Sequence, residues 1–163
     1  MSNTVTGYNR TQIILHWVIA ALVVFQFVGH EAIVEVYELI NKGQEPAIPV
    51  LARAHVFLGG LTLILAIWRV VLRLTRGAPD LPAEENAALK IVAKVTHLTL
   101  YAAIFIMPLS GMGAWFGGQE FAATVHAVFK VVVLISVGLH VVGALYQQYV
   151  LKTGLLKRMM KAE

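Results

Sequence analysis

Four long apolar stretches dominate the chain and predict four helices that cross a membrane. They cover about residues 11–29, 52–74, 91–115 and 122–150. A helix needs about 20 mostly apolar residues to span the hydrocarbon core of a bilayer, and each stretch is about that long or longer. The pattern therefore predicts an all-α fold, an integral membrane four-helix bundle.

The polar segment after the first stretch predicts a short additional helix on the membrane surface. The apolar residues of one helical face are Ile33, Val36, Tyr37 and Ile40. The opposite face carries Glu31, Glu35 and Glu38. Such an amphipathic helix buries its apolar face at the interface and keeps its charges in water.

The composition leaves no room for a separate soluble domain, so residues 1–163 are expected to form a single four-helix domain. Of the 163 residues, 58% are hydrophobic and 13% are charged, whereas a soluble domain carries about 25% charged residues. The chain has no cysteine, which excludes disulfides, thiolate metal sites, iron–sulfur clusters and c-type haem attachment. It also has no phosphate-loop, dinucleotide-binding or nucleophile-elbow motif.

The basic residues predict the orientation of the helices. The net charge is +4, but in so apolar a chain basic residues at the cytoplasmic edge explain this charge better than a nucleic-acid partner. If the N-terminus is inside, ten of the thirteen Lys and Arg residues face the cytoplasm. Only Lys42, Arg53 and Lys130 then lie toward the other side. This positive-inside bias predicts that both termini are cytoplasmic.

Five of the six histidines lie inside the predicted spans, where polar side chains are costly and indicate function. His126 and His140 are fourteen residues apart in the last stretch. Both rings therefore leave the same helix face, about 21 Å apart along the axis. His55 shares the outer half of the membrane with His126, while His16 and His97 share the inner half with His140.

Histidines grouped at two depths favour two haems b. A six-coordinate haem takes two axial imidazoles from facing helices at one depth. The outer level offers the pair His55 and His126, and the inner level offers three candidates for two places, which depth alone does not separate. Zinc would need three or four ligands at one point, and the outer pair has no third ligand within the membrane. His30, at the outer end of the first stretch, is expected to be an exposed interfacial residue.

Several motifs together resemble those of the bacterial cytochrome b561 family, over nearly the whole chain. They are His16-Trp17 in the first helix, His55 in the second, the spacing of His97, Pro108 and Gly111 in the third, and the His126/His140 pair followed by residues 156–160. This family is similar to the cytochrome b subunits of formate dehydrogenases and nickel–iron hydrogenases. The resemblance implies that His16 and His140 are the iron ligands of an inner haem b. It likewise implies that His55 and His126 are the iron ligands of an outer haem b, which leaves His97 as the spare histidine.

A stand-alone four-helix chain of this length resembles the superoxide oxidases of that family. This resemblance implies an enzyme of the bacterial inner membrane that oxidises superoxide on the periplasmic side and passes electrons through two haems b to ubiquinone. Arg53 and Lys130 are the outer cations expected to attract the superoxide anion or to pair with haem propionates. His97 is expected to supply a titratable group for quinone reduction.

Two other functions stay open at this point. The chain fits a cytochrome b electron-transfer subunit that docks to a dehydrogenase or another redox partner protein, and it also fits a haem-free structural or transport bundle. Two departures from the superoxide oxidases are visible in the sequence. The turn at residues 117–120 is much shorter, and Gln147 and Gln148 stand where relatives often have histidines.

Overall fold

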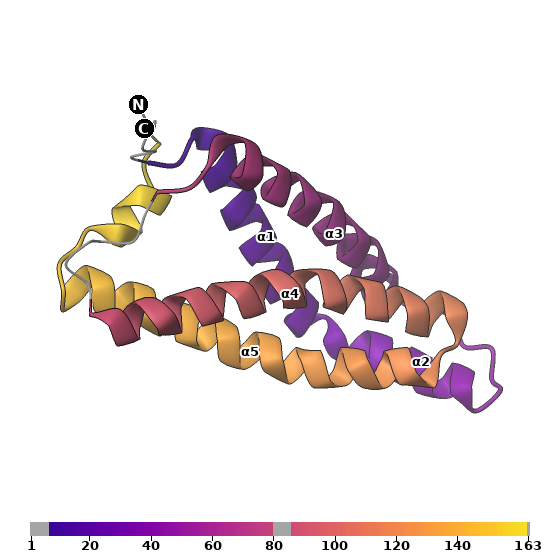
Figure 1. Cartoon of the computed structure of the whole chain (residues 1–163). Coiled ribbons are helices and arrows are strands. Elements are labelled where there is room, and N and C mark those ends of the chain that lie inside the picture. Colours follow the sequence, from indigo (N-terminus) through magenta and orange to yellow (C-terminus); the bar gives the residue numbers. More distant parts are fainter. Residues whose placement is uncertain (1–6, 80–85, 163) are drawn as a thin grey trace.

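The computed structural model describes residues 7–79 and 86–162, and the described chain is all helical (Figure 1). Its elements are α1 (Arg10–Val28), α2 (His30–Asn41), α3 (Val50–Arg76), α4 (Ala87–Gly117), α5 (Glu120–Tyr149) and the 3₁₀-helix η1 (Leu155–Met159). Helices α1, α3, α4 and α5 are each long and apolar enough to cross a membrane. The prediction of an all-α chain with four membrane-length apolar helices is therefore confirmed.

Capping residues explain where the helices begin and end. Asn9 and Gln12 form a capping box at the start of α1, in which each side chain accepts a hydrogen bond from the backbone N–H of the other. Asn86 caps α4 in a similar way, by accepting a hydrogen bond from the backbone of Ala88. Gly118, in the left-handed conformation at φ +60°, ends α4 and allows α5 to begin at Glu120.

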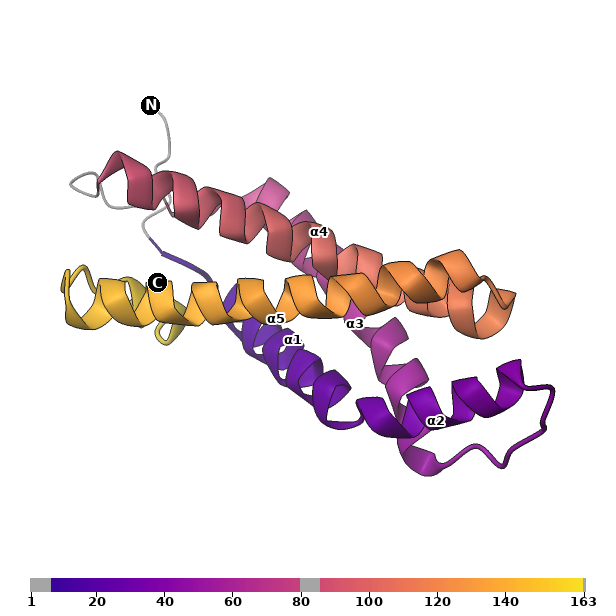
Figure 2. The same cartoon turned by 90° about the horizontal axis from the view of Figure 1, so that it is seen from below.

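Helices α4 and α5 form a long antiparallel hairpin and lie side by side in both views (Figures 1 and 2). Small residues permit a close approach near the connection, since a Cβ atom added at Gly113 would lie 3.1 Å from the Cβ of Ala122. Because this connection is so short, α4 is the neighbour against which the first residues of α5 pack.

Helices α1 and α3 form a second pair, which polar contacts hold together at both ends. At one end the side-chain amide of Gln12 donates to the carbonyl of Gly77 over 3.0 Å, and Arg69 Nη1 donates to the carbonyl of Gln12 over 2.9 Å. At the other end Gln26 Nε2 donates to the carbonyl of His55 over 3.1 Å. These contacts fix the register of α1 against α3.

Helix α2 confirms the predicted short helix between the first two spans. Val36 is only 2% exposed on its inner face, while Glu31, Glu35 and Glu38 are exposed on the remainder of the helix.

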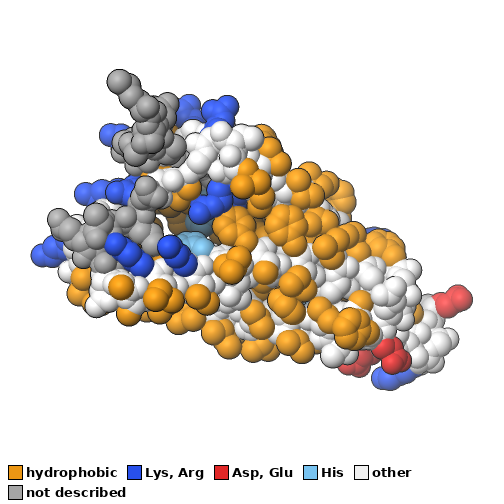
Figure 3. All heavy atoms as spheres, in the orientation of Figure 1, with side chains coloured by type: hydrophobic (Ala, Val, Ile, Leu, Met, Phe, Trp, Pro, Cys, Tyr) orange, Lys and Arg blue, Asp and Glu red, His pale blue; other side chains and the backbone are white. Residues whose placement is uncertain are grey.

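The surface carries a broad apolar region between two charged ends. Large side chains such as Phe57, Leu98 and Phe121 are more than two-thirds exposed, which is expected of residues that contact lipid tails rather than water. Figure 3 shows hydrophobic side chains across the middle of the molecule, Lys and Arg side chains gathered at one end, and Asp and Glu at the other end. This distribution is that of a multi-pass membrane protein.

Candidate functional site

Three histidines from three helices meet at the inner level. The ring centres of His16 (α1) and His140 (α5) are 6.1 Å apart, and those of His97 (α4) and His140 are 5.0 Å apart. The ring of Trp17 lies 5.3 Å from that of His16. The structure brings together all three inner candidates, and His97 lies closer to His140 than His16 does.

A second group of histidines meets at the outer level. The ring centres of His55 (α3) and His126 (α5) are 6.4 Å apart, as predicted from their depths. His30, at the start of α2, lies 6.4 Å from His55. The expectation that His30 is an exposed interfacial residue is wrong, because α2 folds back over α3 and leaves the ring only partly exposed.

The spacing of both predicted pairs fits an iron held between two imidazoles. With metal–nitrogen bonds of about 2 Å, two rings that coordinate one metal from opposite sides have centres about 6 Å apart. The pairs His16–His140 and His55–His126 have this separation. Nδ1 of His55 is buried and has no hydrogen-bond partner among the described residues.

His126 is held by α4 in the tautomer that a metal ligand needs. Its Nδ1 lies 2.9 Å from the carbonyl oxygen of Met107 and 3.3 Å from Oγ of Ser110. A carbonyl only accepts, so the proton of His126 is on Nδ1 and the lone pair is on Nε2. Histidines that bind metals commonly donate their other ring N–H to a carbonyl in this way.

A cation lies beside the outer histidines. Lys130, one turn after His126 on α5, donates from Nζ to Nε2 of His30 over 2.9 Å. Partial burial and the ammonium of Lys130 lower the pKa of His30 below its usual value, so its ring is neutral at pH 7 and can accept this bond. The guanidinium of Arg53 is exposed and makes no hydrogen bond or ion pair with any described residue.

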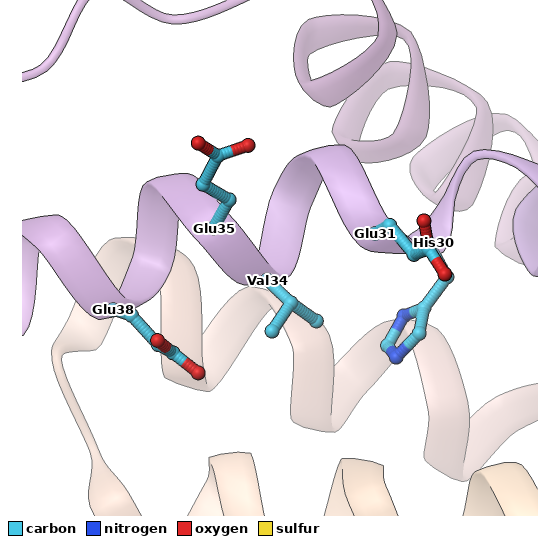
Figure 4. A pocket seen from close by; sticks show the side chains of 5 residues that line it. All are labelled: His30, Glu31, Val34, Glu35 and Glu38. Carbon is cyan, nitrogen blue, oxygen red and sulfur yellow. The ribbon is translucent and has the colours of Figure 1, made fainter.

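An acidic pocket lies along α2 next to this cation. Figure 4 shows the ring of His30 and the side chains of Val34 and Glu38 on one side of the helix and Glu35 on the other. Glu31 also lines the pocket. The outer surface near the histidines therefore carries both signs of charge.

His97 occupies the basic end of the molecule. Its Nδ1 lies 2.7 Å from the carbonyl oxygen of Ala93, one turn earlier in α4, and its side chain is exposed. Arg73 of α3 lies 5.5 Å from the ring centre of Tyr101, also on α4. Figure 3 shows histidine side chains in a hollow bordered by Lys and Arg side chains at this end.

Zinc is not favoured by the arrangement. Among the described residues, no three His, Asp or Glu side chains are grouped closely enough to hold a metal ion by themselves. An iron that is already held in the plane of a porphyrin needs only two protein ligands.

Comparison with known proteins shows the family to which this arrangement belongs. Residues 7–162 match the family described as prokaryotic cytochrome b561. The chain belongs to this family. As a cytochrome b561 it is a membrane protein of electron transport that binds haem b.

Two relatives match nearly the whole length of this cytochrome. It is 37% identical over 155 residues to cytochrome b562 of Cereibacter sphaeroides, a match that covers 95% of this chain and 96% of the relative. It is 24% identical over 174 residues to the probable superoxide oxidase CybB of Yersinia pestis, which covers 94% of this chain and 95% of the relative.

The structure adds contacts to this cytochrome that we did not predict from the sequence. They are the seat of His126 on Met107 and Ser110, the bond from Lys130 to His30, and the hydrogen bond from Trp17 Nε1 to the carbonyl of Met159, which is 2.8 Å long. The sequence did give a signal for the bond from Lys130 to His30, because a cation inside a span needs a polar partner. The carbonyls of Met107 and Met159 belong to the backbone and have no sequence signal.

Proposed function

We propose that this cytochrome b561 carries two haems b and moves electrons from superoxide on the periplasmic side to ubiquinone on the cytoplasmic side. The observation that carries the proposal is the convergence of histidines at two separate levels, with α5 supplying one histidine to each level. When bound, haem b supplies an iron that accepts and releases one electron at a time.

The ligands proposed for the outer haem are His55 and His126. Two features support this assignment: a ring separation of 6.4 Å, and a proton on Nδ1 of His126 that leaves the lone pair on its Nε2. The ligands proposed for the inner haem are His16 and His140, whose rings are 6.1 Å apart. Choosing His16 over His97 rests on the family resemblance.

Lys130 is proposed to attract superoxide. Its ammonium lies at the outer level, and a positive charge near the outer histidines raises the local concentration of an anion while leaving neutral oxygen free to depart. Arg53, exposed at the start of α3, adds a second positive charge on this side. The name of the Yersinia pestis relative points to the same substrate.

His97 is proposed to supply protons for quinone reduction. Reducing ubiquinone to ubiquinol consumes two protons, so a group able to exchange protons beside the inner level is useful. His97 lies beside His140, is reachable from the surface, and has its second ring nitrogen available because Nδ1 is bound to Ala93.

A single purified preparation tests the proposal. The protein alone, expressed with ample haem supply, is expected to show the spectrum of haem b with two haems per chain. When it is mixed with a superoxide generator and a soluble ubiquinone, ubiquinol is expected to form at a rate that superoxide dismutase abolishes. Pigmented protein that leaves the ubiquinone oxidised would contradict the superoxide assignment.

A second candidate is an electron carrier that serves a protein partner on the outer side. It is favoured by the acidic face of α2, where Glu31, Glu35 and Glu38 repel an anion and attract a basic protein. The similarity to cytochrome b562 of Cereibacter sphaeroides is also greater than that to the superoxide oxidase. Failure to react with superoxide, together with salt-sensitive reduction by a basic redox protein, would favour this candidate.

A further inference from the structure

We propose that α4 builds a seat for the outer haem ligand, in which Gly111 and Ser110 are positioning residues for His126. The proposal rests on the proposed role of His126 as an iron ligand. It adds that the orientation and the basicity of this imidazole are set by α4, a helix that supplies none of the four proposed ligands.

Gly111 supplies the space in which the ring of His126 lies. A Cβ atom added at Gly111 would be 3.1 Å from Cε1 and 3.2 Å from Nδ1 of His126. The ring must then shift by a few tenths of an ångström, or turn, to avoid the extra methyl group. Moving α4 away from α5 would instead open the close packing between Gly113 and Ala122 near the same end of the two helices, which is unfavourable.

Ser110 and Met107 hold the proton of His126. The hydroxyl of Ser110 lies 2.6 Å from the carbonyl oxygen of Ile106 and 3.0 Å from that of Met107, and therefore donates to its own helix. Its oxygen lone pairs are then available to Nδ1–H of His126, which also donates to Met107. The backbone carbonyl and the hydroxyl together fix the ring plane and direct Nε2 away from α4.

The two histidines of the outer level are therefore unequal. His126 donates from Nδ1 to an acceptor on another helix, whereas Nδ1 of His55 has no partner among the described residues. When the ring N–H that does not face the metal is hydrogen-bonded, the imidazole becomes a more basic ligand and stabilises the ferric state of the iron. The seat is thus expected to lower the reduction potential of the outer haem, which favours electron flow away from the outer side.

The variant Gly111→Ala tests whether the ring of His126 needs the space beside Gly111, and Gly138→Ala is its matched control. A Cβ atom added at Gly138 on α5 meets nothing within 4 Å, so this variant is expected to keep two haems per chain. Gly111→Ala is expected to lose about half of the haem, or to keep it with an altered low-spin electron paramagnetic resonance signal for one haem only.

Ser110→Ala tests the hydrogen bond without adding bulk. Two haems per chain are expected, with the midpoint potential of one haem raised and that of the other unchanged in a redox titration. Thr124→Ala is the control, because its hydroxyl also bonds to its own helix, at the carbonyl of Glu120, but not to a histidine. Its two potentials are expected to equal those of the unmodified protein.

The variant His126→Ala distinguishes a failure of the ligand assignment from a failure of the seat. If this variant keeps both haems, the ligand assignment and the proposed function fail together. If it loses one haem while Gly111→Ala and Ser110→Ala leave haem content, resonance signal and both potentials unchanged, the seat is refuted and the ligand assignment stands.

Discussion

His97 and His16 both lie beside His140, and the distances between the ring centres bear on which of the two is the second ligand of the proposed inner pair. His97 is 5.0 Å from His140 and His16 is 6.1 Å from it. The shorter separation is too small for an iron between the two rings, which needs about 6 Å. The longer separation agrees with the proposed pairing of His16 with His140, which the family resemblance implies.

His97→Ala is expected to keep two haems per chain and to slow ubiquinone reduction by about tenfold or more, because a proton donor is lost. Haem content by pyridine haemochrome assay and the rate of ubiquinol formation measure the two effects. His16→Ala is the companion variant, and it is expected to lose one haem. If the two variants exchange these outcomes, His97 is the ligand and His16 is the spare.

Lys130 is the cation that the structure places at the outer histidines. Lys130→Gln is expected to lower the second-order rate with superoxide about fivefold, equivalent to about 1 kcal/mol, because the local positive charge is lost. Lys42→Gln is the matched control, since Lys42 is exposed on the same side and pairs only weakly with Glu38 at 3.9 Å. Stopped-flow kinetics at several salt concentrations measures the rates of both variants with superoxide. Equal rates in the two variants would exclude attraction of superoxide by Lys130.

At the scale of the elements, one of the contacts that pair α1 with α3 is made by a buried side-chain amide. Gln12 is only 4% exposed, caps the start of α1 and donates to Gly77 at the end of α3. Because α1 carries His16 and α3 carries His55, this contact links a helix of the inner level to a helix of the outer level.

Gln12→Ala is therefore expected to destabilise the protein by about 1–3 kcal/mol, since it leaves buried polar groups without partners. Thermal unfolding in detergent, followed by loss of the haem absorbance, measures the effect as a lower transition temperature. Gln44→Ala, at an exposed position between α2 and α3, is the control and is expected to unfold at the temperature of the unmodified protein. A Gln12→Ala variant as stable as this control would show that the amide contributes little.

The elements themselves were largely predictable, whereas their detailed contacts were not. Long apolar runs identify α1, α3, α4 and α5, and glutamates at helical spacing identify α2, because both patterns follow directly from burial and helical periodicity. The grouping of histidines by depth followed from the axial rise of a helix. The position of His30 and the seat of His126 depend on the turn after α1 and on a backbone carbonyl, and neither leaves a pattern in the sequence.

At the scale of the whole molecule, the described residues include four membrane-length helices, and this even number is expected to bring Arg10 and Tyr149 to the same side of the membrane. The hydrogen bond between Trp17 and Met159 agrees with this, because it brings η1 against the first half of α1. The basic residues of that side predict that it is the cytoplasmic one.

A green fluorescent protein fused after residue 162 is accordingly expected to fluoresce in cells, because this reporter folds in the cytoplasm but not after export in unfolded form. A fusion of the same reporter after Gly43, between α2 and α3, is expected to stay dark. Immunoblots that show similar amounts of both fusions complete the measurement. The reverse pattern would place the Lys130 side in the cytoplasm and exclude superoxide capture from the periplasm.

The order of the spans has a consequence for biogenesis. Helix α5 carries His126 and His140, one histidine of each proposed pair, and it follows α1, α3 and α4 in the chain. If both proposed pairs hold haem, neither pair is complete before α5 has been synthesised, so insertion of both pigments would follow the synthesis of this helix. A nascent polypeptide that stalls before α5 enters the bilayer would thereby be left without either prosthetic group.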